Sequence, residues 1–546
     1  MALRQFRGFV AAGLFLSGVI LFLSTSSVVA DAQESITTYH YDNYRTGWNQ
    51  NETTLTPANV ASASFGLLKT VTVDDQVDAQ PLYVPGVNIT AGNYQGTHNV
   101  VYVVTGNNSV YAIDAESGTV LLSPNFGAPV ASPLGCHNNG PNVGITSTPV
   151  IDLTSNLMYI MVYNNGTSGP MYTLHALDIG SLTDRVTPQV VVASHTLTNG
   201  TTFNFNATYE RQRPALLLAN GTVYAGFGSF CDLAPSVSRG WLLGWQTGTL
   251  TPLGANQLMD TQATSPNTFF LSSIWMSGYG PSADDSGNVL IVTGNSDPSG
   301  TTYDGVTNIQ ESVVEMSPDL TTVLTLFTPS NQPALDKSDV DFGAGGVLVL
   351  PDQAGSIPHM AVAAGKDGDM YLMNENDLGG YSSTKNNVLG TYQIGHCYCG
   401  QSYFTNAKSV PFVVTSGGET VGVWKLGTSP APGLKNVTNS PTLATGQNGG
   451  FFTSISSNGA HNAIIWALSR PVSKNQPGMT LYALNPNATG TPMPILFQGS
   501  AGTWPNYSGD SNQVPVVANG EVFVASDKEL QIFGLKAKSK NVASKK

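Results

Sequence analysis

Apolar and polar residues alternate in short runs along most of the chain, and turn-forming sequences separate these runs. The clearest unit lies between Asn99 and Leu122, where VVYVVT is followed by the turn sequence GNNS, the run SVYAID and a second turn, AESG. A period of two places alternate side chains of a strand in the core and outside it. Each unit of this kind therefore predicts a chain of antiparallel hairpins.

The same unit recurs along the sequence at irregular spacings of roughly forty to seventy residues, the range of propeller blades. Later copies contain GITSTPVID, PALLLANGTVYAGFGSF, GPSADDSGNVLIVTGN, GGVLVLPD, SVPFVVTSGGETVGVWKL, FFTSISSNGAHNAIIWALSR and VPVVANGEVFVASDKELQIFGL. We count eight copies, and seven is the alternative count. The repeats predict an all-β fold, an eight-bladed β-propeller with four-stranded antiparallel blades.

One strand sequence precedes the first full repeat and has no partners of its own. It is GLLKTVTVD, from Gly66 to Asp74. Joining both ends of the chain in one sheet would leave no long exposed edge strand. We therefore predict that this segment is the outer strand of the last blade and closes the ring, in a single domain over residues 33–535.

The two ends of the chain differ in composition from the repeats. Arg4 and Arg7 precede an apolar stretch from Phe9 to Leu23 and small residues up to Ala32, the order of a secretory signal peptide over residues 1–32. An uncleaved anchor is the alternative, although the stretch is shorter than the ~20 residues that span a bilayer. Residues 536–546 contain five lysines and are predicted to be a disordered tail. We expect a protein that is secreted or periplasmic.

Composition narrows the partners of this chain. Apolar residues make up 41% of the sequence, charged residues only 10%, and the net charge is −13. Such a charge repels phosphate backbones and anionic membrane surfaces, so we expect no nucleic-acid partner, and no later segment is long and apolar enough to span a membrane. Several N-x-S/T sequences, such as those at Asn51 and Asn436, would carry glycans in a eukaryotic source.

The repeat also resembles that of a known superfamily. Val101 and Tyr102, the run from Ser109 to Asp114, and Gly118 match the repeat of pyrroloquinoline-quinone-like propellers, the quinoprotein alcohol dehydrogenase-like superfamily. The phrases HYDNYRTGWNQNETTLTPANV, VDAQPLYVPGV, HMAVAAGKDGDMYLMN and HCYCGQSYF are similar to secreted bacterial members without an established activity. This resemblance implies the fold, because one propeller scaffold carries unrelated chemistries.

The resemblance offers pyrroloquinoline quinone with calcium as a cofactor. Quinone-dependent dehydrogenases of this superfamily hold it between a tryptophan face and a disulfide of adjacent cysteines, with calcium on carboxylate and amide oxygens and an aspartate as base. The present chain has no adjacent cysteine pair and no CxxCH haem-attachment sequence. The missing pair speaks against the quinone, and the sequence identifies no other cofactor and no metal site.

Polar and reactive residues concentrate just before the predicted innermost strands, which would bring them to one end of a central channel. The ligand-binding candidates are Asp78, Gln80, Asn138, Arg211, Arg213, Trp275, Gln401, Trp504 and Asn512, and the catalytic candidates are His137, His396, Asp341 and Asp510. Arg211 and Arg213 would face alike on a strand and present two guanidinium groups to a carboxylate. Alternatively, Asp339, Asp341 or Asp510 hold these arginines as structural ion pairs.

The chain has four cysteines, Cys136, Cys231, Cys397 and Cys399. In an exported protein we favour disulfides over a metal site. Cys397 could bridge to Cys399, or either could pair with Cys136 or Cys231. The competing hypothesis is a soft-metal site made by Cys397, Cys399, His396 and His137.

Two kinds of function follow from these observations. The first is an extracytoplasmic propeller that binds a small molecule, a carbohydrate or a protein at the mouth of its channel. The alternative is a secreted enzyme, either a quinone- and calcium-dependent dehydrogenase of alcohols or sugars, or a lyase or hydrolase of acidic polysaccharide. In the lyase His137 or His396 would act as the base while Arg211 and Arg213 grip the carboxylate.

Overall fold

The computed structural model describes residues 34–138, 140–447, 449–487, 490–509 and 511–537. The predicted signal peptide and nearly all of the predicted tail lie outside these residues, so both stay predictions. Lys536, the first residue of that tail, donates its backbone N–H to Ser64 at 2.7 Å. No helix in the described ranges has the length and apolarity needed to span a membrane.

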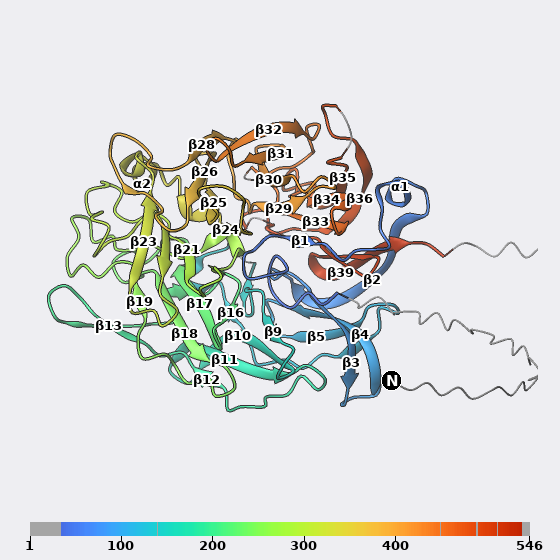
Figure 1. The fold of residues 1–546 in the computed structure, drawn as a ribbon. Helices are drawn as coiled ribbons and strands as arrows, with labels where there is room; N and C mark the ends of the chain where they lie inside the picture. Colours follow the sequence, from blue (N-terminus) through green and yellow to red (C-terminus); the bar gives the residue numbers. More distant parts are fainter. Residues whose placement is uncertain (1–33, 139, 448, 488–489, 510, 538–546) are drawn as a thin grey trace, which may run out of the picture. The chain divides into compact units, whose positions relative to one another are not determined.

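Eight blades follow one another around the propeller, each mainly a four-stranded antiparallel sheet (Figure 1). The first blade contains β3 (Leu82–Ile89), β4 (Gly96–Val104), β5 (Val110–Asp114) and β6 (Val120–Leu122), and the second contains β9 (Val150–Asp152), β10 (Leu157–Gly166), β11 (Gly169–Asp178) and β12 (Gln189–Val190). The third contains β16 (Leu217–Ala219), β17 (Thr222–Ser229), β18 (Trp241–Gln246) and β19 (Gln257–Leu258), and β15 (Glu210–Arg211) also pairs with β17. The fourth contains β20 (Ser282–Ala283), β21 (Val289–Val292), β22 (Val313–Met316) and β23 (Val323–Thr328), and β27 (Gly380–Tyr381) extends it.

The other four blades complete the predicted count of eight. The fifth blade contains β24 (Val347–Leu350), β25 (Met360–Ala364), β26 (Asp369–Asn374) and β28 (Gly390–Gln393), and the sixth contains β29 (Ser402–Thr405), β30 (Pro411–Gly417), β31 (Thr420–Gly427) and β32 (Gly433–Asn439). The seventh contains β33 (Thr453–Asn458), β34 (His461–Leu468), β35 (Gly478–Leu484) and β36 (Ile495–Thr503), and β1 (Trp48–Asn49) lies parallel to β33. The eighth contains β37 (Val516–Ala518), β38 (Glu521–Ala525), β39 (Asp527–Leu535) and β2 (Phe65–Gln76). The alternative of seven blades is wrong.

Strand β2 confirms the predicted closure of the ring. It pairs antiparallel with β39, from Phe65 opposite Leu535 to Gln76 opposite Asp527, and the two lie side by side in Figure 1. An N-terminal strand thus completes a sheet whose other three strands come from the end of the domain. Such pairing satisfies backbone groups that an open edge would leave to solvent.

The core lies between the faces of neighbouring blades. Tyr224, Val289 and Tyr371, from the third, fourth and fifth blades, belong to one continuous apolar cluster. Phe65 of β2 packs on Trp466 of the seventh blade with ring centroids 5.6 Å apart. Because each sheet buries side chains on both faces against its neighbours, the many apolar residues have room in the core despite the short strands.

A segment ahead of the first blade runs along the inner strands of all eight blades. We call residues 36–52 the N-terminal strap. Its backbone and side chains bond in chain order to one inner strand after another, through Ile36 with Tyr83, Thr37 with Ile151, Asn43 with Leu218 and Ala283, Tyr44 with Val349, Thr46 with Tyr403, Gly47 with Ile455 and Asn49 with Val517. The strap therefore satisfies the inner edges of the blades and fills this part of the channel.

Arg45 is the central side chain of the strap. It is 0% exposed, and its guanidinium donates to the carbonyl oxygens of Pro281 at 3.0 Å, Tyr39 at 2.8 Å and Leu216 at 3.2 Å. Burial lowers its pKa to about 10, although Tyr279 and Asp42 oppose this shift. The guanidinium therefore stays charged and joins the strap to the third and fourth blades through neutral acceptors.

Candidate ligand-binding site

A cavity of about 320 Å³ lies at the ends of the inner strands through which the chain enters them. The segments before these strands supply Asn138, Arg211 of β15, Arg213, Trp275, Ser277, Asp339, Asp341, Tyr398, Ser508 and Asn512. The ends of the second strands and the loops after them supply Ser229 of β17, Cys231, Asp232 and Lys366. The volume is at the lower end of the ~300–1,000 Å³ found for small-molecule sites. A ligand of a few rings at most would fit.

The strap lies next to this cavity and narrows the channel behind it. The charges of Arg213, which lines the cavity, and of Arg45, in the strap, both act on the hydroxyl of Tyr39. Tyr39 is 2% exposed and stacks on His40 with ring centroids 4.6 Å apart. The strap thus stands directly behind the basic side of the cavity.

Arg211 and Arg213 form the basic side of the cavity. Arg213 donates from Nη1 to the carbonyl oxygen of Thr146 at 3.0 Å, whereas Nε of Arg211 is buried and has no hydrogen-bond partner. Burial lowers the pKa of Arg211 to about 10, and the like charge of Arg213 lowers it further while Asp78 opposes the shift. Burial also lowers the pKa of Arg213, again against the effect of Asp78. Both remain cations at neutral pH.

These contacts bear on the predicted alternative of structural ion pairs. Asp78, 3% exposed, is the carboxylate whose charge acts on both arginines. Asp341 instead pairs with Lys366, whose Nζ also lies 3.7 Å from Oδ1 of Asp339. Two of the three predicted ion-pair partners are therefore engaged by a lysine, and the third, Asp510, lies outside the described residues.

Lys366 and the aspartates form the other side of the cavity. The ammonium of Lys366 lies 5.4 Å from the ring centroid of Trp275 and 5.3 Å from that of Tyr398. Burial by itself would lower the pKa of Lys366, but Asp341, Tyr398 and Asp339 outweigh burial and raise it. Burial, together with the charge of Asp341, raises the pKa of Asp232 to about 6. The cavity therefore has a basic wall facing a wall of mixed charge.

Several cavity residues have a left-handed backbone that side chains rarely adopt. The φ angles are +52° at Cys231 and Asp232, +48° at Ser277 and +53° at Asp339. Each such residue costs of the order of 1 kcal/mol or more, and strained residues cluster at functional sites. Twenty further non-glycine residues with positive φ lie elsewhere in the described chain, so this backbone strain is not confined to the cavity.

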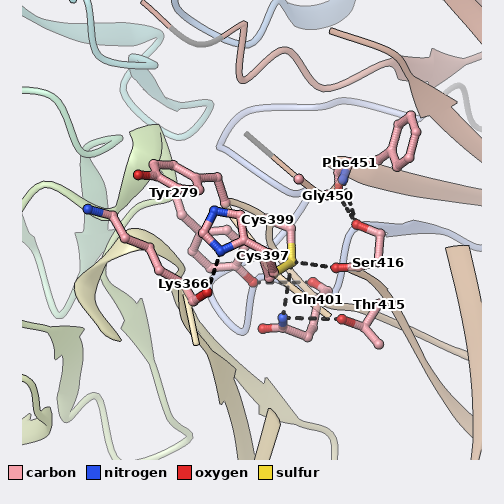
Figure 2. Close-up of a disulfide and its surroundings, with 12 residues drawn as sticks. Tyr279, Lys366, Cys397, Cys399, Gln401, Thr415, Ser416, Gly450 and Phe451 are labelled. Atoms are coloured by element: carbon pink, nitrogen blue, oxygen red, sulfur yellow. Dashed lines mark hydrogen bonds between the residues drawn. A yellow bond between two sulfur atoms is a disulfide. The ribbon is translucent and has the colours of Figure 1, made fainter. Parts of the chain in front are cut away.

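The four cysteines form two disulfides, Cys136–Cys231 and Cys397–Cys399. Figure 2 shows the surroundings of the second bridge. Sγ of Cys399 lies 3.0 Å from the carbonyl oxygen of Ser416 and accepts a hydrogen bond from Nε2 of Gln401 at 3.7 Å. This bridge brackets Tyr398, which lines the cavity. Because both cysteine pairs are oxidised, the alternative soft-metal site has no thiolates.

The structure brings about half of the predicted site residues to the cavity. Asn138, Arg211, Arg213, Trp275, Asp341 and Asn512 line it. Asp78 does not line the cavity, but its charge acts on both Arg211 and Arg213. Five other predicted residues do not line the cavity: His137, His396, Gln80, Gln401 and Trp504. Asp510 lies outside the described residues.

The remaining candidates have structural contacts. Gln80 accepts the backbone N–H of His40 at 3.0 Å, and Trp504 donates to the carbonyl oxygen of Gly509 at 2.7 Å. Gln401 is 0% exposed beside the Cys397–Cys399 bridge. Nδ1 of His396 donates to the carbonyl oxygen of Lys366, and the carbonyl oxygen of His137 accepts from Asn506 at 3.1 Å. These contacts, through side chains or, at His137, through the backbone, are structural.

Sequence reasoning missed Lys366, Asp232 and Tyr398. Lys366 and Asp232 follow the second strands of their blades, β25 and β17, which end on the same side as the inner strands begin. In an antiparallel hairpin the second strand ends beside the start of the first. The loop that follows a second strand therefore lies at the same channel end, and this position could have identified Lys366 and Asp232. Tyr398 lies within the HCYCG sequence that drew attention only for its cysteines.

Comparison with known proteins shows the fold. No family model and no curated protein sequence matches the chain. A quinohemoprotein alcohol dehydrogenase from Comamonas testosteroni has a TM-score of 0.59 at 12% identity over 94% of this chain and 82% of its own. Alcohol dehydrogenase ADHIIG from Pseudomonas putida HK5 has 0.58 at 13% over 93% and 81%, and a europium-containing methanol dehydrogenase 0.58 at 11% over 92% and 98%. The chain thus shares the propeller fold of these dehydrogenases, which is the fold that the repeats predicted.

The residues at the cavity do not fit a quinone with calcium. Cys397 and Cys399 are 0% exposed and do not line the cavity, and the disulfide that reaches the cavity, Cys136–Cys231, joins residues 95 apart rather than adjacent cysteines. Of the carboxylates at the cavity, Asp339 and Asp341 already contact Lys366, and Arg211 and Arg213 add two further positive charges that would repel a calcium ion. We derive no chemical step through this cofactor.

Proposed function

We propose that this chain is an exported propeller that binds a small carboxylated molecule in the cavity at the end of its channel. The observation that carries the proposal is the pair of cationic guanidinium groups, Arg211 and Arg213, at the wall of that cavity. A carboxylate can accept hydrogen bonds from guanidinium groups, and such charge-assisted bonds are roughly twice as strong as neutral ones. The two disulfides support an oxidising, extracytoplasmic location.

The surroundings favour a ring-bearing acid over a simple anion. Trp275 and Tyr398 offer aromatic surface, with ring centroids 5.9 Å apart, and Ser229 and Asn512 offer hydrogen-bonding groups at the same cavity. Aromatic surface with a few polar groups is typical of sugar and aromatic ligands. Acidic sugars combine all of these features.

The experiment compares carboxylates with their neutral counterparts. Purified protein is screened by thermal shift against glucuronate, galacturonate, malate and indole-acetate, each beside its uncharged alcohol or amide, and the hits are measured by calorimetry. We expect at least one acid to bind tenfold or more tightly than its counterpart, and Arg211→Met to remove that preference. Arg185→Met is the matched control, because Arg185 is a largely exposed arginine on the second blade. A panel in which no acid is preferred overturns the proposal.

The alternative of a secreted enzyme stays a prediction. The similar dehydrogenases share only the fold at 11–13% identity. Within the described residues, neither His137 nor His396 lines the cavity where the lyase hypothesis needs a base. Binding a carboxylate needs no catalytic base, only cationic, aromatic and hydrogen-bonding side chains such as those that line the cavity.

A further inference from the structure

A second cavity lies between the outer part of the fifth blade and the sixth blade, where β28 lies beside β32 (Figure 1). It has a volume of about 280 Å³, and we call it the sixth-blade groove. Its lining includes Gln393 of β28, Gly422 and Trp424 of β31, and Asn436 and Asn439 of β32. The described lining residues are all uncharged, and none of them lines the ligand cavity. The groove is therefore a separate site.

The strand register gathers these side chains on one face of the sixth blade. Gly422 lies opposite Asn439, and Trp424 lies opposite Asn436, in the pairing of β31 with β32. Residues two apart on a strand share a face, and so do their partners on the next strand. One aromatic side chain and two amides therefore stand next to one another.

Gly422 keeps the middle of the groove open. A Cβ atom at this position would lie 2.9 Å from Oδ1 of Asn439, 3.0 Å from Nε1 of Trp424 and 3.2 Å from Nδ2 of Asn436. Gly422 is not among the glycines with positive φ, so the space and not the backbone conformation calls for a glycine. An indole donor and two amide groups thus converge on a point that a larger residue would fill.

Asn436 and Asn439 orient each other at this point. Nδ2 of Asn436 donates to Oδ1 of Asn439 at 2.9 Å, and Nδ2 of Asn439 donates to Oδ1 of Asn436 at 3.3 Å. A carboxamide has two N–H donors and an oxygen that accepts two hydrogen bonds. The reciprocal pair therefore leaves each amide one donor and one acceptor position for a ligand.

The indole ring of Trp424 is held in place by the fifth blade. Its centroid lies 5.7 Å from that of Tyr392, with the rings edge to face at 62°. The hydroxyl of Tyr392 accepts the backbone N–H of Leu434 at 2.8 Å, which joins this ring to β32. Trp424 itself is half-buried, and its Nε1 donates to no described residue without being one of the buried polar atoms. The indole N–H is therefore accessible.

We propose that the sixth-blade groove binds an uncharged sugar ring. One face of a pyranose carries C–H groups that pack on aromatic surface, and its hydroxyls both donate and accept hydrogen bonds. The groove offers an indole ring with amides beside it, and no charged side chain among the described lining residues would select an ion. Its volume is just below the ~300–1,000 Å³ of small-molecule sites, so one or two rings would fit.

The groove opens at the same end of the propeller as the ligand cavity. Strand β30 ends at Gly417, which lines the groove, just as the second strand of the third blade ends at Ser229, which lines the cavity. The chain also runs from Gln393 at the groove to Tyr398 at the cavity, and five residues extend at most ~18 Å. An oligosaccharide could reach both sites, but the sugar site depends on its own residues and not on the carboxylate site.

The experiment measures the binding of uncharged sugars to protein exported to the periplasm of a bacterial host, where disulfides form and Asn436 carries no glycan. Methyl glycosides of glucose, galactose, mannose and N-acetylglucosamine are screened by saturation-transfer NMR, and the hits are measured by calorimetry. We expect at least one dissociation constant on the order of 1 mM or lower.

Two variants test the groove itself. Gly422→Ala fills the point of convergence, and Trp424→Leu removes the aromatic surface, so each should weaken binding at least tenfold. Gly427→Ala is the matched control on the same strand, because the nearest atom to its Cβ position is the carbonyl oxygen of Gly433 at 3.8 Å. Circular dichroism checks folding, and Gly422→Ala keeps the indole, so it tests the site even where Trp424→Leu is unstable.

A further variant separates the groove from the ligand cavity. Arg211→Met should leave the affinity for uncharged sugars unchanged, since Arg211 lines only the cavity. Three results overturn the proposal. The first is no saturable binding of any sugar of the panel up to tenfold above the expected constant, and the second is wild-type affinity in Gly422→Ala. The third is a loss of affinity in Arg211→Met, which would place the sugar in the ligand cavity.

Discussion

The guanidinium of Arg213 lies directly against the backbone of Gly278, at a place where a Cβ atom would overlap it. Gly278 has φ +86° and follows Ser277, which lines the ligand cavity. A glycine is needed here both for its backbone conformation and for the space that it leaves. The fourth blade thus positions a cation that belongs to the third.

Gly278→Ala should therefore weaken carboxylate binding. The added methyl group displaces Arg213 from Thr146, and the positive φ adds about 1–2 kcal/mol of destabilisation. We expect the dissociation constant for the best acid of the panel to rise tenfold or more, measured by calorimetry. Gly254→Ala is the control, since nothing lies within 4 Å of its Cβ position. Unchanged affinity in Gly278→Ala would show that Arg213 does not bind the ligand.

Removing Lys366 should destabilise the protein through Asp341. Asp341 is 3% exposed, and its other oxygen accepts the backbone N–H of Asn295 at 2.8 Å. Lys366→Met leaves a buried carboxylate without its cation, which costs about 3–5 kcal/mol. Urea unfolding should show this loss, and Lys366→Met/Asp341→Asn should recover much of it. Equal stability of the single and double variants would contradict the pairing.

The two disulfides should differ in what they stabilise. Cys136–Cys231 joins residues 95 apart, and Cys397–Cys399 joins residues 2 apart. Loop-closure entropy assigns about 4–5 kcal/mol to the first and about 1–2 kcal/mol to the second. Double alanine variants, compared by urea unfolding, should follow this order. The second pair should instead affect ligand affinity, because it holds Tyr398 at the cavity.

Arg45→Lys should destabilise the strap almost as much as Arg45→Met. The guanidinium of Arg45 donates hydrogen bonds to three backbone carbonyl oxygens, and a lysine ammonium cannot reach all three at once. We expect a loss of at least about 3 kcal/mol in each variant by chemical denaturation. Arg185→Lys, on the exposed surface, should be near neutral. A stable Arg45→Lys protein would argue that only the charge matters.

The stability of the protein should fall as the pH rises, through the buried carboxylates of Glu315 and Glu375. The pKa values of Glu315 and Glu375, about 7 and about 8, lie above the ordinary 4.5. Their contribution is fully present below pH 4.5 and is lost as the pH rises through 7 and 8, on the order of a few kcal/mol together. The difference in unfolding free energy between wild type and Glu315→Gln/Glu375→Gln isolates it from other groups. A difference independent of pH between 5 and 9 would contradict these shifted values.

The alternating runs were sufficient to predict the blades. Within the predicted unit, Val100 to Val104 lie in β4 and Val110 to Asp114 form β5, and Gly66 to Asp74 lies inside β2. Runs of strand-forming residues between turns are a local signal, although both faces of a propeller strand are buried, as they are from Val100 to Val104. The site followed in part from the same logic, since residues before inner strands must gather at one end of a closed ring.

The sequence by itself determined the all-β class, the number of blades, the closing strand and the candidates Arg211, Arg213, Trp275 and Asp341 at one channel end. Tertiary structure alone decided that Cys397 pairs with Cys399, that Lys366 rather than an arginine takes Asp341, and that the strap contacts every blade. The reason is physical: runs of strand-forming residues and the turns between them are local signals, but partners across a ring lie far apart in sequence, and only closure of the ring sets their distances.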